Sequence, residues 1–101
     1  MTKYNKLVRD GIPEHIQGKG GTPIFHVAGE NEYWEKLKEK LGEEVAEFLK
    51  DESVEEMADL WEVVEAIMEY KKFDHAEIQA VKNKKASERG KFKNKIILDE
   101  S

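Results

Sequence analysis

Two short acidic runs, residues 43–47 (EEVAE) and 56–59 (EMAD), constrain the fold more than any other feature of this sequence. Each run spaces carboxylates three residues apart, which makes them neighbours on the surface of a helix. On wheels drawn at about 100° per residue, Glu44 falls inside the apolar stripe of one predicted helix and Glu56 inside that of the next. We therefore expect carboxylates from two helices to share an apolar interface.

This placement predicts a metal site. An ionised carboxylate enters an apolar interface only with a partner, because its desolvation costs several kcal/mol. Mg²⁺ or Mn²⁺, a hard cation that prefers oxygen ligands, is the simplest counter-charge. Before a cation binds, repulsion should raise the pKa of some of these carboxyl groups. The non-functional alternative is that these carboxylates form a solvated acidic face. Glu56 has a further structural explanation, because Ser53 and Glu56 have the spacing of a capping box.

Composition limits the fold and the class of partner. A chain of 101 residues with 39% charged side chains and two prolines predicts a single, mainly helical domain over residues 1–101. The absence of cysteine excludes disulfides and thiolate metal sites. A net charge of −5 argues against nucleic acid as a partner. We find no apolar stretch of membrane-spanning length and no signal-peptide core, and therefore expect a cytoplasmic protein without membrane contact.

Capping and periodicity signals divide the chain into short and long elements. The long helices carry the acidic runs. The short strands are predicted because Ile, Phe and Val favour extended structure. The expected elements are a helical turn at 13–17, a strand at 22–28, a helix from Asn31 as N-cap to about 50, a helix at 54–71 capped by Ser53, a helix capped by Asp74 that ends at about 88, and a strand at 95–98. Whether the two strands pair stays open.

The helix expected at 54–71 is apolar around more than half of its circumference. A three-helix monomer of this size could hardly bury that surface, so we expect a homodimer or homotetramer in which these helices pack between subunits. Trp34, Phe48 and Trp61 are expected in the core, and base stacking is the alternative for them.

Three motifs in order carry a family resemblance. They are the Glu-Glu-x-x-Glu and Glu-x-x-Asp runs, the segment Tyr4-Asn5-Lys6-Leu7-Val8-Arg9-Asp10 with Ile12-Pro13, and Lys85-x-x-x-Arg89-Gly90-x-Phe92. Together they resemble the MazG-like all-α nucleoside triphosphate pyrophosphohydrolases, in their small, phosphoribosyl-ATP pyrophosphohydrolase-like branch. The resemblance implies a helical bundle completed by oligomerisation, with minor β segments. It also implies Mg²⁺-dependent cleavage of nucleoside triphosphates between the α and β phosphates, giving monophosphate and pyrophosphate, with the removal of noncanonical nucleotides as a role.

The resemblance also implies roles for particular residues. The metal ligands would be Glu44, Glu47, Glu56 and Asp59, and Glu43 would orient the attacking water. The phosphate contacts would be Lys85, Arg89, Lys6 and Arg9. Simple surface charge is the alternative for all four cations, with Lys85 and Arg89 placed at the negative end of a helix. The functional alternatives are a phosphoribosyl-ATP pyrophosphohydrolase-like activity on another nucleotide, and a non-catalytic helical interaction module.

Overall fold

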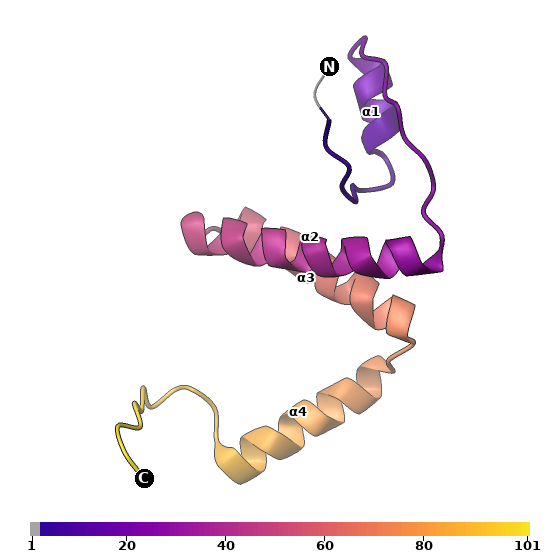
Figure 1. Ribbon diagram of the computed structural model, residues 1–101. Coiled ribbons are helices and arrows are strands. Elements are labelled where there is room, and N and C mark those ends of the chain that lie inside the picture. Colours follow the sequence, from indigo (N-terminus) through magenta and orange to yellow (C-terminus); the bar gives the residue numbers. More distant parts are fainter. Residues whose placement is uncertain (1–2) are drawn as a thin grey trace.

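The computed structural model describes residues 3–101 and contains four helices there: α1 (Ile12–Gly18), α2 (Glu30–Lys50), α3 (Val54–Lys71) and α4 (His75–Arg89). The expectation of a mainly α fold is confirmed. Helices α2 and α3 lie side by side, with α1 on one side of this pair and α4 on the other (Figure 1). Within these residues, no helix is both long enough and apolar enough to cross a bilayer.

The two predicted strands, 22–28 and 95–98, are wrong. Neither segment has strand structure in the described chain, and both expose their large apolar side chains. An extended segment becomes a strand only when a neighbour takes up its backbone donors and acceptors. Figure 1 shows the two segments on opposite sides of the α2–α3 pair, where neither can serve as that neighbour.

Side-chain caps fix the start of two helices. The Ser53 hydroxyl accepts a hydrogen bond from the Glu56 N–H at 3.2 Å, and Asp74 accepts one from the Ala76 N–H at 3.1 Å. Both predicted caps are confirmed. The predicted cap at Asn31 is wrong, because the extended backbone ends at Gly29, whose carbonyl accepts the first helical bond from Tyr33 at 2.9 Å.

The core lies between α2 and α3 and is small. Leu37, only 1% exposed, and Val63 are the buried apolar side chains in the described chain. Trp34 stacks on Tyr70 with ring centroids 5.2 Å apart, which supports its predicted place in the packing. The expectation that Trp61 is a core residue is wrong for a single copy of the chain, because this side chain is 61% exposed.

Candidate metal centre

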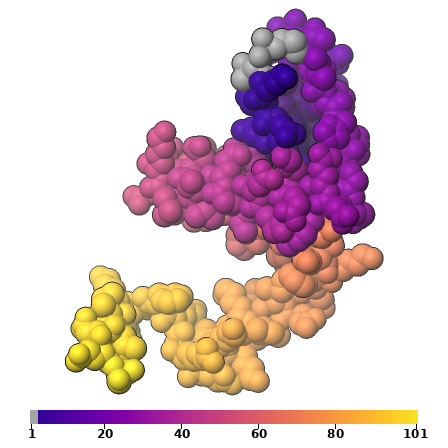
Figure 2. Space-filling view, viewed as in Figure 1, coloured from indigo at the N-terminus to yellow at the C-terminus, as the bar shows by residue number. Residues whose placement is uncertain are grey.

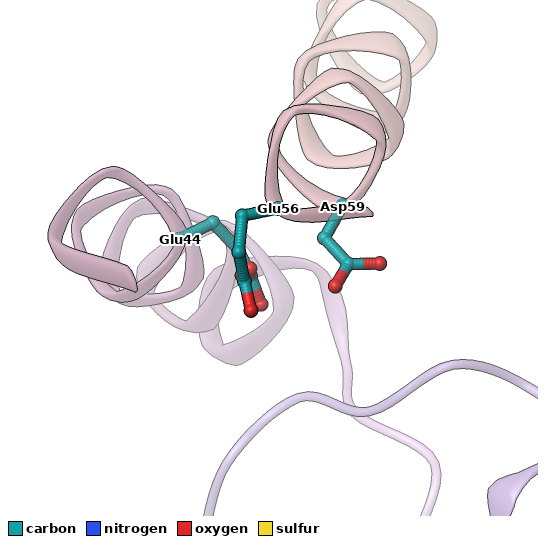
Figure 3. Close-up of side chains that lie close together, drawn as sticks. All are labelled: Glu44, Glu56 and Asp59. Atoms are coloured by element: carbon teal, nitrogen blue, oxygen red, sulfur yellow. The ribbon is translucent and has the colours of Figure 1, made fainter. Parts of the chain in front are cut away.

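Three carboxylates from two helices converge at one end of the α2–α3 pair. Glu44 comes from α2, while Glu56 and Asp59 lie in the first two turns of α3, where the Ser53 cap fixes the start of the helix. One carboxylate oxygen from each lies within 4.8 Å of those of the other two. Figure 3 shows the three side chains directed to the same side of the helix pair.

The three carboxylates differ in their cationic partners. Glu44 is buried, with 8% of its surface exposed, and lies 3.3 Å from the Lys40 ammonium. Asp59 accepts a hydrogen bond from the Arg9 guanidinium at 2.8 Å. Among residues 3–101, no cation lies within ion-pairing distance of Glu56.

The charge of the group acts most strongly on Glu56. Desolvation raises the pKa of this carboxyl, and repulsion from Glu47, Asp59 and Glu44 raises it further. The expectation of a raised pKa within the cluster is therefore confirmed. A cation bound here would relieve that repulsion.

The donor set fits a hard divalent cation. All three groups offer carboxylate oxygen, and the chain contains no thiol that would favour a softer metal. Mg²⁺ is held in proteins by a few carboxylates, with water and phosphate oxygens completing its octahedron. Glu44, Glu56 and Asp59 could supply such a partial shell.

The other two acidic residues of the predicted site lie beside this group. Glu47 is exposed and does not belong to the converging trio, although its charge acts on Glu56. Glu43 accepts hydrogen bonds from Lys6 at 3.1 Å and Lys40 at 3.3 Å. The bond from Lys6 is the main reason that the pKa of Glu43 is lowered. A carboxylate held ionised in this way suits the orientation of a water molecule better than the acceptance of its proton.

The predicted cations divide into two sets. Lys6 and Arg9, in the segment before α1, reach the acidic residues through Glu43 and Asp59. Lys85 and Arg89 are exposed on α4, which extends away from the α2–α3 pair (Figure 1). Of the four predicted cations, Lys6 and Arg9 lie at the candidate centre within one copy of the chain.

Sequence reasoning missed Lys40, which lies between two of the acidic side chains. Its ammonium is 3.3 Å from both Glu43 and Glu44, and its side chain is largely buried. The signal was present, because Lys40 stands three and four residues before these glutamates on the same helix. The contacts of Lys6 and Arg9 gave no such signal, since they join residues 37 and 50 positions apart.

Comparison with known proteins gives one partial match. An uncharacterized protein of Mycolicibacterium smegmatis is 52% identical over 42 residues, which is 42% of this chain and 43% of that protein. The chain thus matches less than half of the length of this relative. No protein-family model matches the sequence, and no solved structure matches the fold.

Proposed function

We propose that this protein is a Mg²⁺-dependent nucleoside triphosphate pyrophosphohydrolase of the MazG-like type. It would cleave the bond between the α and β phosphates with one water, giving a monophosphate and pyrophosphate. The convergence of Glu44, Glu56 and Asp59 across two helices is the observation that carries the proposal. Three carboxylate oxygens within 4.8 Å of one another repel one another without a cation, and a bound cation would relieve that repulsion.

The acidic residues would hold the metal and place the water. Bound Mg²⁺ would supply charge neutralisation for the triphosphate and would lower the pKa of a coordinated water. Glu44, Glu56 and Asp59 would bind the ion, with Glu47 as the fourth carboxylate at the rim. Glu43, kept ionised by Lys6 and Lys40, would orient the attacking water.

The cations would bind the phosphate chain. Arg9 pairs with a candidate metal ligand, so its guanidinium would be close to a phosphate oxygen bound beside that carboxylate. Lys6 approaches from the same segment. Lys85 and Arg89, on α4, are also proposed to bind phosphate oxygens.

The working unit is proposed to be a homodimer or homotetramer. The small core of one copy and the exposed apolar side chains of α3 support this assembly. We propose the cytoplasm as the compartment, because nucleoside triphosphates and Mg²⁺ are both abundant there.

The test is pyrophosphate release from a panel of canonical and noncanonical nucleoside triphosphates and phosphoribosyl-ATP, with Mg²⁺ and with EDTA. Glu56→Gln is the most informative variant, because removing an unpaired charge from a repulsive group should leave the fold intact. Glu62→Gln, an exposed position on the same helix, is the matched control.

The proposal expects Mg²⁺-dependent formation of monophosphate and pyrophosphate, at least about 100-fold slower in Glu56→Gln and unchanged in Glu62→Gln. Turnover of phosphoribosyl-ATP but of no nucleoside triphosphate would support the alternative, a phosphoribosyl-ATP pyrophosphohydrolase-like activity. No turnover of any nucleotide by the folded protein would contradict both and would favour the helical interaction module.

A further inference from the structure

The segment that precedes α1 contacts both helices that carry the acidic group. We call residues 4–11 the N-terminal strap. Its hydrogen bonds to these helices fall on α2 at Lys36 and Glu43, and on α3 at Asp59. In Figure 2 the indigo part of the strap lies against the α2–α3 body, on the same side as α1.

Charged groups, more than apolar burial, hold the strap in place. Leu7 is the only residue of the strap that is not exposed. The Lys6 ammonium donates to Glu43 at 3.1 Å, and the Arg9 guanidinium donates to Asp59 at 2.8 Å. Exposed ion pairs of this kind are weak and are screened by salt. The strap could therefore leave the two helices without opening the core between them.

Lys36 gives the strap a contact away from the acidic group. Its ammonium donates a hydrogen bond to the backbone carbonyl of Asn5 at 2.8 Å, and its side chain is only 19% exposed. Asn5 has a φ of 45°, in the left-handed region that asparagine adopts more readily than most residues. By binding this carbonyl, Lys36 holds the turn that comes directly before Lys6. Lys36 is thus a positioning residue for the strap, although its own ion pair is with Glu39, outside the acidic trio.

Asp59 is both the partner of the strap and a candidate metal ligand. A divalent cation bound to this carboxylate would repel the Arg9 guanidinium that is already there. Each cation would lower the affinity of the site for the other, because such linkage is reciprocal. A docked strap should therefore weaken metal binding, and a bound metal should loosen the strap.

We propose that the N-terminal strap and a divalent cation compete for the acidic group: Arg9 occupies Asp59 in the metal-free protein, Lys36 keeps the strap docked, and metal binding releases Arg9. The competition rests on the metal site of the proposed function. The docking of the strap does not. The released guanidinium is free to pair with another anion, so metal binding and the exposure of Arg9 are one event.

Mn²⁺ binding to the full chain, followed by electron paramagnetic resonance of the free ion, tests the competition without any assay of turnover. Arg9→Gln removes the competitor and should bind Mn²⁺ about three- to fivefold more tightly than the wild type at low salt. Lys36→Gln should also tighten binding, by about twofold, because it loosens the strap. Lys38→Gln removes an equal charge from the same helix but breaks only a pair with Glu35, so its Mn²⁺ affinity should match the wild type.

The same titration has two kinds of contradictory result. Weaker Mn²⁺ binding by Arg9→Gln would show that Arg9 orients Asp59 for the metal, and equal binding would show that the two cations do not compete. Either result would overturn the inference and leave the metal site standing. An absence of Mn²⁺ binding by the wild type and all three variants would instead contradict the proposed function, and the competition with it.

Limited proteolysis with chymotrypsin measures the docking of the strap itself. Tyr4 in the strap and Phe92 near the C-terminus are both exposed, so the ratio of cleavage after Tyr4 to cleavage after Phe92 cancels changes in protease activity. Without metal, this ratio should rise at least about twofold in Arg9→Gln and in Lys36→Gln, because the strap is open more often. It should not change in Lys38→Gln.

Addition of Mg²⁺ should raise the Tyr4 to Phe92 cleavage ratio of the wild type and should have less effect on Arg9→Gln, which has lost the contact that the metal breaks. A ratio that falls when Mg²⁺ binds would show that the metal tightens the strap, and this would overturn the proposal. Ratios that are equal in the wild type, Arg9→Gln and Lys36→Gln without metal would show that these contacts do not hold the strap.

Discussion

At the scale of single residues, the candidate centre is a group of acidic side chains with too few cations. Lys40 lies beside Glu44 and Arg9 beside Asp59, yet Glu56 between them has no such partner among the described residues. Desolvation and repulsion from the neighbouring carboxylates together raise the pKa of Glu56. A cation from outside the chain would relieve this imbalance, and this supports the proposed metal site.

Glu56→Gln should increase the free energy of unfolding of the metal-free protein at pH 7. Desolvation and repulsion from Glu47 and Asp59 raise the pKa of Glu56, so the folded state holds this proton more tightly than the unfolded state. The contribution of Glu56 to stability is consequently lost as the pH rises above the ordinary carboxyl pKa. The advantage of Glu56→Gln should shrink as the pH falls from about 7 to about 4.

Urea unfolding across this pH range measures the effect, with Glu62→Gln as the control that should match the wild type. Excess Mg²⁺ should reverse the order, because it stabilises the wild type, which binds the ion more tightly, more than it stabilises the variant. A Glu56→Gln variant that is less stable than the wild type at pH 7 without metal would contradict this account of the cluster.

Arg9→Gln separates a role in phosphate binding from a role in stability. The pair with Asp59 is exposed, so its loss should lower the free energy of unfolding by less than about 1 kcal/mol. A lost charge-assisted bond to phosphate should lower kcat/KM at least about tenfold. Lys38→Gln, which breaks an exposed pair with Glu35 of the same 2.8 Å length, should leave kcat/KM unchanged. Equal activity of the two variants would remove Arg9 from the proposed site.

At the scale of elements, local signals predicted the helices and missed what depends on distant partners. Helix α3 begins and ends where the periodicity and the Ser53 cap place it. The predicted N-cap of α2 was wrong, because the backbone conformation makes Gly29 the N-cap. Glycine has no capping side chain that could have indicated this in the sequence. The predicted strands were wrong for a related reason. Apolar content favours an extended backbone, but a strand also needs a second extended segment beside it. The two predicted segments lie on opposite sides of the α2–α3 pair and cannot pair with each other (Figure 1).

Ser53→Ala should destabilise the protein by about 1 kcal/mol, because the Glu56 N–H loses the hydroxyl that caps α3. Denaturant unfolding measures this change, and Ser87→Ala, in the interior of exposed α4, should change the stability by less than about 0.5 kcal/mol. Because the cap also fixes the first turn of α3, Ser53→Ala should weaken Mg²⁺ binding too. Unchanged stability would show that the start of α3 is fixed by other contacts.

At the scale of the whole molecule, the sequence predicted association between copies, and this stays a prediction. The wide apolar arc of α3 predicted association, and the exposed Trp61 identifies the uncovered part of that arc. The acidic trio was predictable because helical spacing fixes which carboxylates share a face. The position of Lys85 and Arg89 was not predictable, because it depends on the direction that α4 takes after Lys72, which local sequence does not fix.

The central claim is that the acidic group binds a divalent cation, and Mn²⁺ titration followed by electron paramagnetic resonance of the free ion tests it most directly. The account predicts saturable binding by the wild-type protein and by Glu62→Gln, displacement by Mg²⁺, and at least about tenfold weaker binding by Glu56→Gln. Equal Mn²⁺ binding by all three proteins, or none by any, would contradict the account.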